Sequence, residues 1–446
     1  MQNKINEVLP FKALHYNPQA VTDIGRCLSQ PYDVISPEKQ EMYYKQHPYN
    51  IIRLILNKTE PEDNAESNPY TRALAYYTEW KEKQILTTSH HPAFWVYEQE
   101  YSVPGMGKKK LKGFIGLVKL ADFEEMRILP HEKILKGALE DRIKLTQTTH
   151  SQLEYIWGVY RDKRYTIDSL LEECEQQIPV INYYEADYDV NHKLWQLADS
   201  EKTGVIHEVM SGNKIYIADG HHRYNTMLAI RNEMRTRFPD AGEKAPWEYI
   251  MMYLTNSEHE GLTVLPTHRM VHDLKAVDMD KILTAIAGYF TVEKISGTDD
   301  KDTLQKQWLA GMQTSGADQH KIGMYRGNQY YILTLKEPEK YCSLYKQEHS
   351  REWMFLDVNI LNTLVFEQIL GITEEQLALN TNIKYTVKAE EAVAGVDSSR
   401  MQFAFILNGT RFEDVIAVSD HKEVMPRKST FFYPKPVSGL VIYPME

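Results

Sequence analysis

The segment between residues 214 and 237 constrains the fold more than any other part of the sequence. The apolar run at residues 214–218 predicts a buried strand, and the apolar stripe from Tyr224 to about Arg237 predicts a helix. Only the polar turn Asp-Gly-His-His, residues 219–222, separates the two. A strand joined to a helix by so short a turn is a building unit of α/β folds. We therefore expect a mixed α/β protein.

The residue types of this turn are suited to binding an anion. Gly220 lets the backbone approach a phosphate group, and the first N–H groups of the following helix point toward it. Arg223 adds a guanidinium that can bind phosphate with two parallel hydrogen bonds. Asp219 is a candidate magnesium ligand or proton acceptor, and His221 and His222 are candidate phosphate donors or proton carriers. The structural alternative is that Asp219 only caps the helix and the histidines make surface hydrogen bonds.

A second polar group precedes a helix predicted at residues 133–149. His131 and Glu132 lie just before it, and Asp141 and Arg142 lie on it. We expect His131 or Glu132 to act as acid or base, and Arg142 to bind substrate in the same cleft. The alternative is a solvated start of a helix with surface ion pairs.

Two further segments supply cations. His268 and Arg269 follow Pro266-Thr267 at the end of a short predicted strand, where they would display a second cation toward the phosphate pocket. Lys428 lies in the sequence Met-Pro-Arg-Lys-Ser-Thr, without the glycines of a phosphate-binding P-loop before it. We expect His268, Arg269 and Lys428 to bind substrate, and no Walker motif is present.

Four histidines leave a metal hydrolase open as an alternative. His131, His221, His222 and His268 are possible ligands of zinc or another transition metal. No pair of them has the His-x-x-x-His spacing of a site on one helix.

The remaining periodicity suggests three parts. Residues 1–273 are expected to form a core with insertions, beginning with short extended pieces and turns over the first 56 residues. A hairpin is expected from residues 93–103 and 110–120. Residues 274–335 predict a small α+β lobe with the order helix, strand, helix, strand, strand, in which Asp278 caps the first helix. Residues 336–446 are expected to pack back as an α/β segment that completes the site, with a helix at 356–370.

The composition excludes several classes of protein. A formal net charge of −11, with acidic and basic residues interspersed, disfavours nucleic acid as a partner. The three cysteines form no CxxC pair, which argues against disulfides and thiolate zinc sites. No signal-peptide pattern and no long apolar run are visible, so a cytoplasmic protein without a membrane partner is expected.

Taken together, the motifs resemble a family of microbial proteins known as domain of unknown function 1015. The resemblance covers nearly the whole chain. One position departs from the family pattern: Ile134 stands where the family usually has threonine. The motifs that carry the resemblance are residues 31–35 (PYDVI), 129–133 (LPHEK), 141–142 (DR), 218–224 (ADGHHRY), 261–263 (GLT), 266–269 (PTHR), 425–430 (MPRKST) and 433–435 (YPK).

The turn is also similar to the Gly-x-x-Arg nucleotide-phosphate turn of the wider ParB and sulfiredoxin superfamily. Sulfiredoxins have a reactive cysteine where this chain has His221, and ParB proteins add a basic DNA-binding helix-turn-helix that is not visible here. Free-serine kinases of this superfamily share Asp-Gly-His-x-Arg, which matches Asp219, Gly220, His221 and Arg223. The resemblance implies a ParB/sulfiredoxin-like core, ATP or ADP with Mg²⁺ as cofactors, and a small hydroxylated or phosphorylated amino acid as substrate.

Three functions follow as hypotheses. The first is a small-molecule phosphotransferase, such as a nucleotide-dependent kinase of a free hydroxy-amino acid like serine. The second is a phosphomonoester hydrolase that acts on a compound such as phosphoserine. The third is a non-catalytic nucleotide-binding regulator.

Overall fold

The computed structural model describes residues 5–103, 107–132, 136–297, 300–313, 319–345 and 349–445. Contacts within the chain divide it into two compact units. The first consists of Met1–Pro130, Ile134–Thr263 and Pro434–Glu446, and the second of His131–Lys133 and Val264–Tyr433. The lobe expected at residues 274–335 thus falls inside the second unit, and the three-part division stays a prediction.

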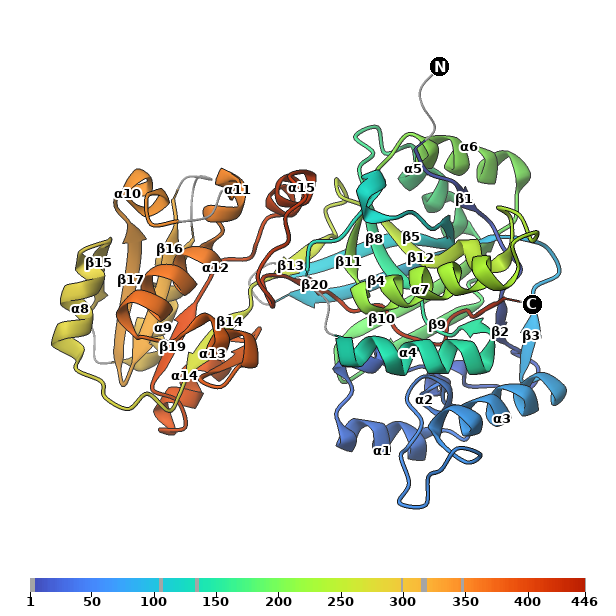
Figure 1. The fold of residues 1–446 in the computed structure, drawn as a ribbon, viewed down its shortest axis with the longest axis horizontal. Coiled ribbons are helices and arrows are strands. Elements are labelled where there is room, and N and C mark those ends of the chain that lie inside the picture. Colours follow the sequence, from blue (N-terminus) through green and yellow to red (C-terminus); the bar gives the residue numbers. More distant parts are fainter. Residues whose placement is uncertain are drawn as a thin grey trace. The chain divides into compact units, whose positions relative to one another are not determined.

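A mixed β-sheet forms the centre of the first unit (Figure 1). Among the described residues its strands lie in the order β6-β11-β8-β12-β5-β4-β10-β9, with β1 paired to β5. Strand β12 runs parallel to β8 and β11 parallel to β6, while β11 is antiparallel to β8. The expectation of a mixed α/β fold is confirmed. The strands are β1 Val8–Leu9, β4 Phe94–Val103, β5 Gly107–Lys119, β6 Ile128–Leu129, β8 Ile156–Tyr160, β9 Ile181–Glu185, β10 Val190–Leu197, β11 Ile215–Asp219 and β12 Tyr249–Asn256.

Helix α7 is held on this sheet by its apolar stripe. Tyr224, Met227 and Ile230 share one buried cluster with Ile156 of β8 and Ile215 of β11. Figure 1 shows α4 running beside α7. This burial fixes the start of α7 at the end of β11. The helices of the unit are α1 Pro37–Gln46, α2 Ile52–Ile55, α3 Pro69–Glu82, α4 Lys136–Thr149, α5 Thr166–Glu172, α6 Ser200–Ser211 and α7 His221–Arg237, and its small strand pairs are β2 Leu14–Tyr16 with β3 Leu86–Thr88 and β7 Ser151–Gln152 with β21 Tyr443–Pro444.

The second unit contains an antiparallel sheet with the strand order β15-β17-β16-β19-β14-β18 among its described residues (Figure 1). Trp308 of α9 and Val393 of α14 pack in one buried cluster against Tyr325, Tyr330 and Ile332 of the sheet. The elements are β13 Thr263–Leu265, β14 His268–Val271, α8 Met279–Ala287, β15 Phe290–Ile295, α9 Lys301–Met312, β16 Lys321–Arg326, β17 Gln329–Leu335, α10 Pro338–Cys342, α11 Arg351–Met354, α12 Asp357–Ile360, a π-helix at Leu361–Ile369, α13 Glu374–Leu379, β18 Ile383–Thr386, α14 Ala389–Asp397, β19 Phe403–Ile406, α15 Phe412–Asp420 and β20 Phe431–Tyr433.

Several local predictions are confirmed. The hairpin is the antiparallel pair β4–β5, and residues 104–106 between the two strands lie outside the described residues. Helix, strand, helix, strand, strand follow one another from α8 to β17, and the Asp278 side chain accepts a hydrogen bond from the Lys281 amide. The expectation of only extended pieces and turns over the first 56 residues is wrong, because α1 and α2 form there. No described helix is long and apolar enough to cross a lipid bilayer.

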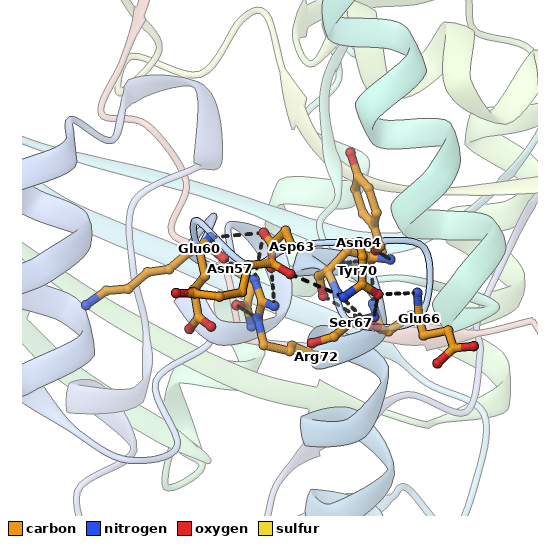
Figure 2. A network of polar contacts seen from close by, with 12 residues as sticks. Asn57, Glu60, Asp63, Asn64, Glu66, Ser67, Tyr70 and Arg72 are labelled. Carbon is orange, nitrogen blue, oxygen red and sulfur yellow. Dashed lines mark hydrogen bonds and ion pairs between the residues drawn. The ribbon is translucent and has the colours of Figure 1, made fainter.

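Polar side chains organise the loop between α2 and α3, as Figure 2 shows. Asn64 Oδ1 accepts hydrogen bonds from the amides of Glu66 and Ser67, at 2.9 and 3.0 Å. Arg72 of α3 reaches back into the loop, pairs with Asp63, and donates to the Lys58 carbonyl at 2.6 Å. One arginine therefore ties the loop to the helix that follows it.

We expect Arg72→Ala to loosen this loop without unfolding the first unit. Cleavage by a glutamyl endopeptidase after Glu60, Glu62 or Glu66 should become about fivefold faster, because local opening no longer breaks the Arg72 contacts. Lys83→Ala, at the exposed end of the same helix, is the control and should leave the rate unchanged. Equal cleavage rates in both variants would contradict this account of the loop.

Candidate functional site

The turn between β11 and α7 consists of a single glycine. Gly220 has a φ of +93° and is the N-cap residue of α7, so the helix begins at His221. A Cβ atom on Gly220 would lie 3.1 Å from Nε and Nη2 of Arg223, which folds back over the turn. Only glycine combines this backbone conformation with room for the guanidinium. The expected strand-turn-helix unit is present.

The carboxylate of Asp219 lies between two cations. Arg223 Nη2 donates to Oδ2 at 2.9 Å, and Lys435 Nζ donates to Oδ1. Burial alone would raise the pKa of Asp219, but the charges of Lys435 and Arg223 outweigh it and lower the pKa to about 2. Asp219 is therefore an ionised acceptor that fixes both cations, and its side chain does not cap the helix.

Arg223 is also held on its other side. Its Nη1 donates to the carbonyl of Tyr155, whereas Nε is buried and has no hydrogen-bond partner among the described residues. Burial would lower the pKa of Arg223, but the charges of Glu154, Asp219 and Asp33 raise it well above its ordinary value. The guanidinium is thus permanently charged, and its Nε–H is left to donate.

Arg142 and Glu154 lie beside Arg223. All three line a small cavity of about 40 Å³, which has room for water but not for a nucleotide. The Arg142 guanidinium stacks on the ring of Tyr32 at 4.0 Å and lies 3.8 Å from Glu154. It also donates to the carbonyl of Ile55 at 2.7 Å. Arg142 therefore belongs to the same cluster as Arg223, and its role in binding substrate stays a prediction.

A second carboxyl group, that of Asp33, lies in the field of this cluster. Desolvation and then the negative charge of Asp219 raise the pKa of Asp33, against the opposing charges of Arg223 and Lys435. The residue Asp33 as a whole is exposed to solvent, but protein atoms surround its carboxyl group. It makes no hydrogen bond or ion pair with the described residues. The two aspartates therefore have pKa values displaced in opposite directions.

The C-terminal segment delivers Lys435 to Asp219. The Lys435 carbonyl accepts from Gln99 Nε2 at 3.2 Å, and Val437 is bound through its carbonyl by Tyr155 and through its amide by the Tyr97 hydroxyl. These contacts hold the backbone at Lys435, the residue that pairs with Asp219, and at Val437 two residues beyond it.

Tyr97 is itself fixed by a fully buried polar chain. Its hydroxyl lies 2.7 Å from Nδ1 of His192, whose Nε2 lies 3.3 Å from Glu185. Gln30 donates to both oxygens of that carboxylate. These contacts orient Tyr97 and, through Val437, the segment that carries Lys435.

The two histidines of the turn have different environments. His221 is buried, and its charge contributes to the lowered pKa of Asp219. His222 is half-buried, and its carbonyl accepts from the Thr226 hydroxyl at 2.9 Å. The catalytic roles predicted for both side chains stay predictions.

The other predicted residues belong to the second unit. His131 is buried, and its Nε2 lies 2.9 Å from the Thr430 hydroxyl, while Glu132 forms a backbone bridge with Met425. His268 Nδ1 accepts from the amide of Leu407 at 3.3 Å. Burial, followed by the charge of Arg269, lowers the pKa of His268 to about 4. His268 is therefore neutral near pH 7.

Arg269 and Lys428 lie together in that unit, where Arg269 Nη2 donates to the Lys428 carbonyl at 2.9 Å. The candidate residues thus form two groups. One surrounds Asp219 in the first unit, and the other surrounds residues 425–430 in the second.

A preformed metal cluster is not found in the described residues, where no three His, Cys, Asp or Glu side chains are grouped to hold an ion. The zinc alternative therefore gains no support from the geometry. The role of Asp219 as a magnesium ligand stays a prediction.

Comparison with known protein families identifies the family of this chain. The family model described as "Protein of unknown function (DUF1015)" matches residues 8–359. The chain belongs to this family. The resemblance found in the sequence motifs is confirmed. No curated protein shows significant sequence similarity to this DUF1015 protein.

Solved structures give distant likenesses to this DUF1015 protein. Free serine kinase in complex with AMP is 11% identical and matches over 72% of this chain and 89% of its own, with a TM-score of 0.34. SbnI from Staphylococcus aureus, with a C-terminal truncation, is 10% identical over 74% and 87%, with a TM-score of 0.34. A conserved hypothetical protein from Pyrococcus furiosus is 12% identical over 69% and 87%, with a TM-score of 0.29.

Three residues of the cluster were not identified as candidates from the sequence. Asp33, Glu154 and Lys435 come from segments far from residues 219–223. Asp33 and Lys435 lie in the PYDVI and YPK motifs, which are shared with the family but carry no chemical pattern of their own. Glu154 has no local signal at all.

We expect Gly220→Ala to destabilise the protein more than Gly242→Ala. Both glycines have positive φ, and alanine there costs about 1–2 kcal/mol. A Cβ on Gly242 meets nothing within 4 Å, whereas one on Gly220 presses on a guanidinium held by Asp219 and Tyr155. Urea unfolding measures the difference, and equal losses of stability would contradict the tight turn.

We expect the effect of Asp219→Asn to depend on pH. At pH 6 the variant should lose about 3 kcal/mol of unfolding free energy, because two buried cations lose their counter-ion. A folded pKa of about 2 lies below the ordinary value, so this stabilisation is complete above about pH 4 and is lost as pH falls toward 2. Urea unfolding at pH 6 and pH 3 should show a smaller difference at pH 3. A pH-independent difference would contradict an ionised Asp219.

Proposed function

We propose that this DUF1015 protein is a small-molecule phosphotransferase. In this proposal it uses ATP or ADP with Mg²⁺ and phosphorylates a free hydroxy-amino acid such as serine. The observation that carries the proposal is the pairing of Arg223 and Lys435 on Asp219, directly at the glycine-capped start of α7. The nucleotide and the amino acid follow from the resemblance of residues 219–223 to the Asp-Gly-His-x-Arg turn of free-serine kinases.

The cluster supplies three kinds of donor to a phosphate chain. Glycine at the N-cap provides no side chain to bond the first amides of α7, and a helix N-terminus favours an anion. Arg223 has its buried Nε free to donate, and Lys435 holds an ammonium beside it. Because Asp219 fixes both cations in advance, little side-chain ordering is needed when phosphate binds.

Asp33 is the proposed proton acceptor for the attacking hydroxyl group. The pKa of Asp33 is raised, whereas that of Asp219 is lowered. Opposite shifts of this kind let Asp33 act as a base while Asp219 stays ionised and acts only through its charge. Transfer of the hydroxyl proton to Asp33 would accompany formation of the new O–P bond and cleavage of the bond to the leaving nucleotide. His221, His222, His131 and Glu132 remain further candidates for acid or base.

The charges of the cluster explain why magnesium is part of the proposal. Four carboxyl groups, those of Asp33, Asp141, Glu154 and Asp219, lie among three cations, Arg142, Arg223 and Lys435. The set is close to neutral, so an added ion is needed to offset a polyphosphate. Asp219 remains the candidate ligand of that ion, although its two oxygens also accept from Arg223 and Lys435. Bound Mg²⁺ would neutralise phosphate charge and orient the nucleotide.

Arg142 is the candidate for substrate recognition in the first unit, and His268, Arg269 and Lys428 are a separate group of candidates in the second unit. Each is a donor or cation suited to the carboxylate or phosphate of a phosphorylated amino acid.

The test of the proposal is phosphorus NMR on the purified protein with Mg²⁺ and either ATP or ADP, in the presence of free hydroxy-amino acids. A parallel sample contains phosphoserine without nucleotide. The proposal predicts a new phosphomonoester signal that grows only when nucleotide and acceptor are both present. Release of phosphate from phosphoserine alone would contradict the proposal and support the phosphomonoester hydrolase instead. Nucleotide binding without any turnover would contradict the proposal and support a non-catalytic nucleotide-binding regulator.

We expect Arg223→Gln to weaken nucleotide binding by about 10- to 100-fold, because a charge-assisted contact to phosphate is lost while the amide can still bond the Tyr155 carbonyl. Arg237→Gln is the control, since this exposed side chain at the far end of α7 only stacks on Phe238. Isothermal titration calorimetry with Mg²⁺ and ADP gives both affinities. Equal affinity in Arg223→Gln and wild type would contradict the assignment.

A further inference from the structure

Arg269 of β14 is a buried cation without a carboxylate partner. Only 2% of the residue is exposed, and no acidic group of the described residues lies within ion-pair distance of it. Its recorded hydrogen bonds go to two backbone carbonyls, those of Thr267 and Lys428. The ring of Tyr385 lies 5.6 Å from the guanidinium carbon.

This arrangement satisfies hydrogen bonds but leaves the charge uncompensated. Burial lowers the pKa of Arg269 to about 10, and the charge of Tyr385 acts in the opposite direction and raises it. Other well-buried arginines of the chain have acids beside them: Arg231 pairs with Asp122, and Arg142 pairs with Asp141. A buried charge without a counter-ion is costly, and proteins rarely keep one unless something else supplies the opposite charge.

More positive charge surrounds Arg269. Arg269 Nη2 donates to the backbone carbonyl of Lys428. The charges of both Arg269 and Arg427 act on the hydroxyl of Tyr385 and lower its pKa, against the larger effect of burial. Lys428 is exposed and has a φ of +58°, so its loop follows an uncommon backbone path. Arg269 and Arg427 thus both act on one tyrosine, and Lys428 follows Arg427 directly in the chain.

A buried hydroxyl group adds an independent observation. Thr267 accepts from Arg269 through its carbonyl, and its Oγ1 is buried without a hydrogen-bond partner among the described residues. A hydroxyl can donate to an oxyanion at the place where Arg269 lacks a counter-ion.

We propose that Arg269, with Arg427 and Lys428, forms an oxyanion site within the second unit that takes the phosphate or carboxylate group of a small metabolite. Arg269 supplies a fixed buried charge, and the two cations of the loop, of which Lys428 is exposed, bring the anion to it. A purely structural clamp on two carbonyls would need neither the charge of Arg269 nor the two further cations. The site needs residues of the second unit alone, so it stands apart from nucleotide binding at Arg223.

The site is tested in an Arg223→Gln background, which weakens the first-unit anion site. The melting temperature is measured while inorganic phosphate, or separately acetate, is titrated at constant ionic strength, with chloride as the reference anion. A ligand of the folded state raises the melting temperature with concentration. Saturable stabilisation by phosphate, by acetate or by both supports the site and identifies which chemistry it accepts. No stabilisation by either anion would overturn it.

Variants of the second unit then locate the anion. Arg269→Gln, which keeps amide donors for the two carbonyls, should weaken the apparent affinity at least tenfold. Lys428→Gln changes an exposed side chain that does not threaten folding, and should weaken it about threefold, as expected for one partly screened cation. Lys384→Gln, exposed on the strand that carries Tyr385, is the matched control and should bind as before. Unchanged affinity in both Arg269→Gln and Lys428→Gln would overturn the proposal, even if nucleotide binding at Arg223 also failed.

Discussion

The carboxylate of Asp219, shared between Arg223 and Lys435, is the interaction on which the candidate site depends. It joins three pieces of chain: the end of a central strand, the first turn of a helix and the C-terminal segment. Both cations are largely buried, so neither could remain charged there at low cost without the acid. The positive φ of Gly220 lets the guanidinium lie over the turn rather than point away from it.

The surrounding fold supports this pairing from two directions. The apolar stripe of α7 sets the helix on the sheet, so that Arg223 is carried to the end of β11. The chain Glu185, His192 and Tyr97 is polar and fully packed, and it holds Val437 two residues beyond Lys435. Hydrophobic burial therefore fixes one cation, and a buried hydrogen-bond chain fixes the other.

Part of the fold and of the candidate site could be predicted from local sequence patterns. The order of helices and strands from α8 to β17 followed from alternating periodicities, and the turn at Gly220 followed from one glycine between a strand and a helix. Helix α1 was missed because only Tyr43 is buried along it, although Ser36 before Pro37 is a typical helix start.

Partners from distant segments were not predictable in the same way. Asp33 and Glu154 act on Arg223 from distant segments of the first unit, and Lys435 reaches Asp219 because the chain returns to that unit at residue 434. No spacing in the sequence encodes these approaches. The sequence predicts Asp219 as a magnesium ligand because an acidic residue before a glycine turn suggests a metal site. It could not show that two cations already occupy both oxygens. The candidate residues are likewise divided between the two units, which the sequence had combined in one pocket.

The central claim is that the cluster at Asp219 receives the phosphates of a nucleotide. A crystal structure of the protein with Mg²⁺ and ADP tests it most directly. The account predicts phosphate oxygens within hydrogen-bond distance of Arg223 Nε and of the first amides of α7. Well-ordered ADP bound elsewhere, with the start of α7 and Arg223 free of phosphate, would contradict it.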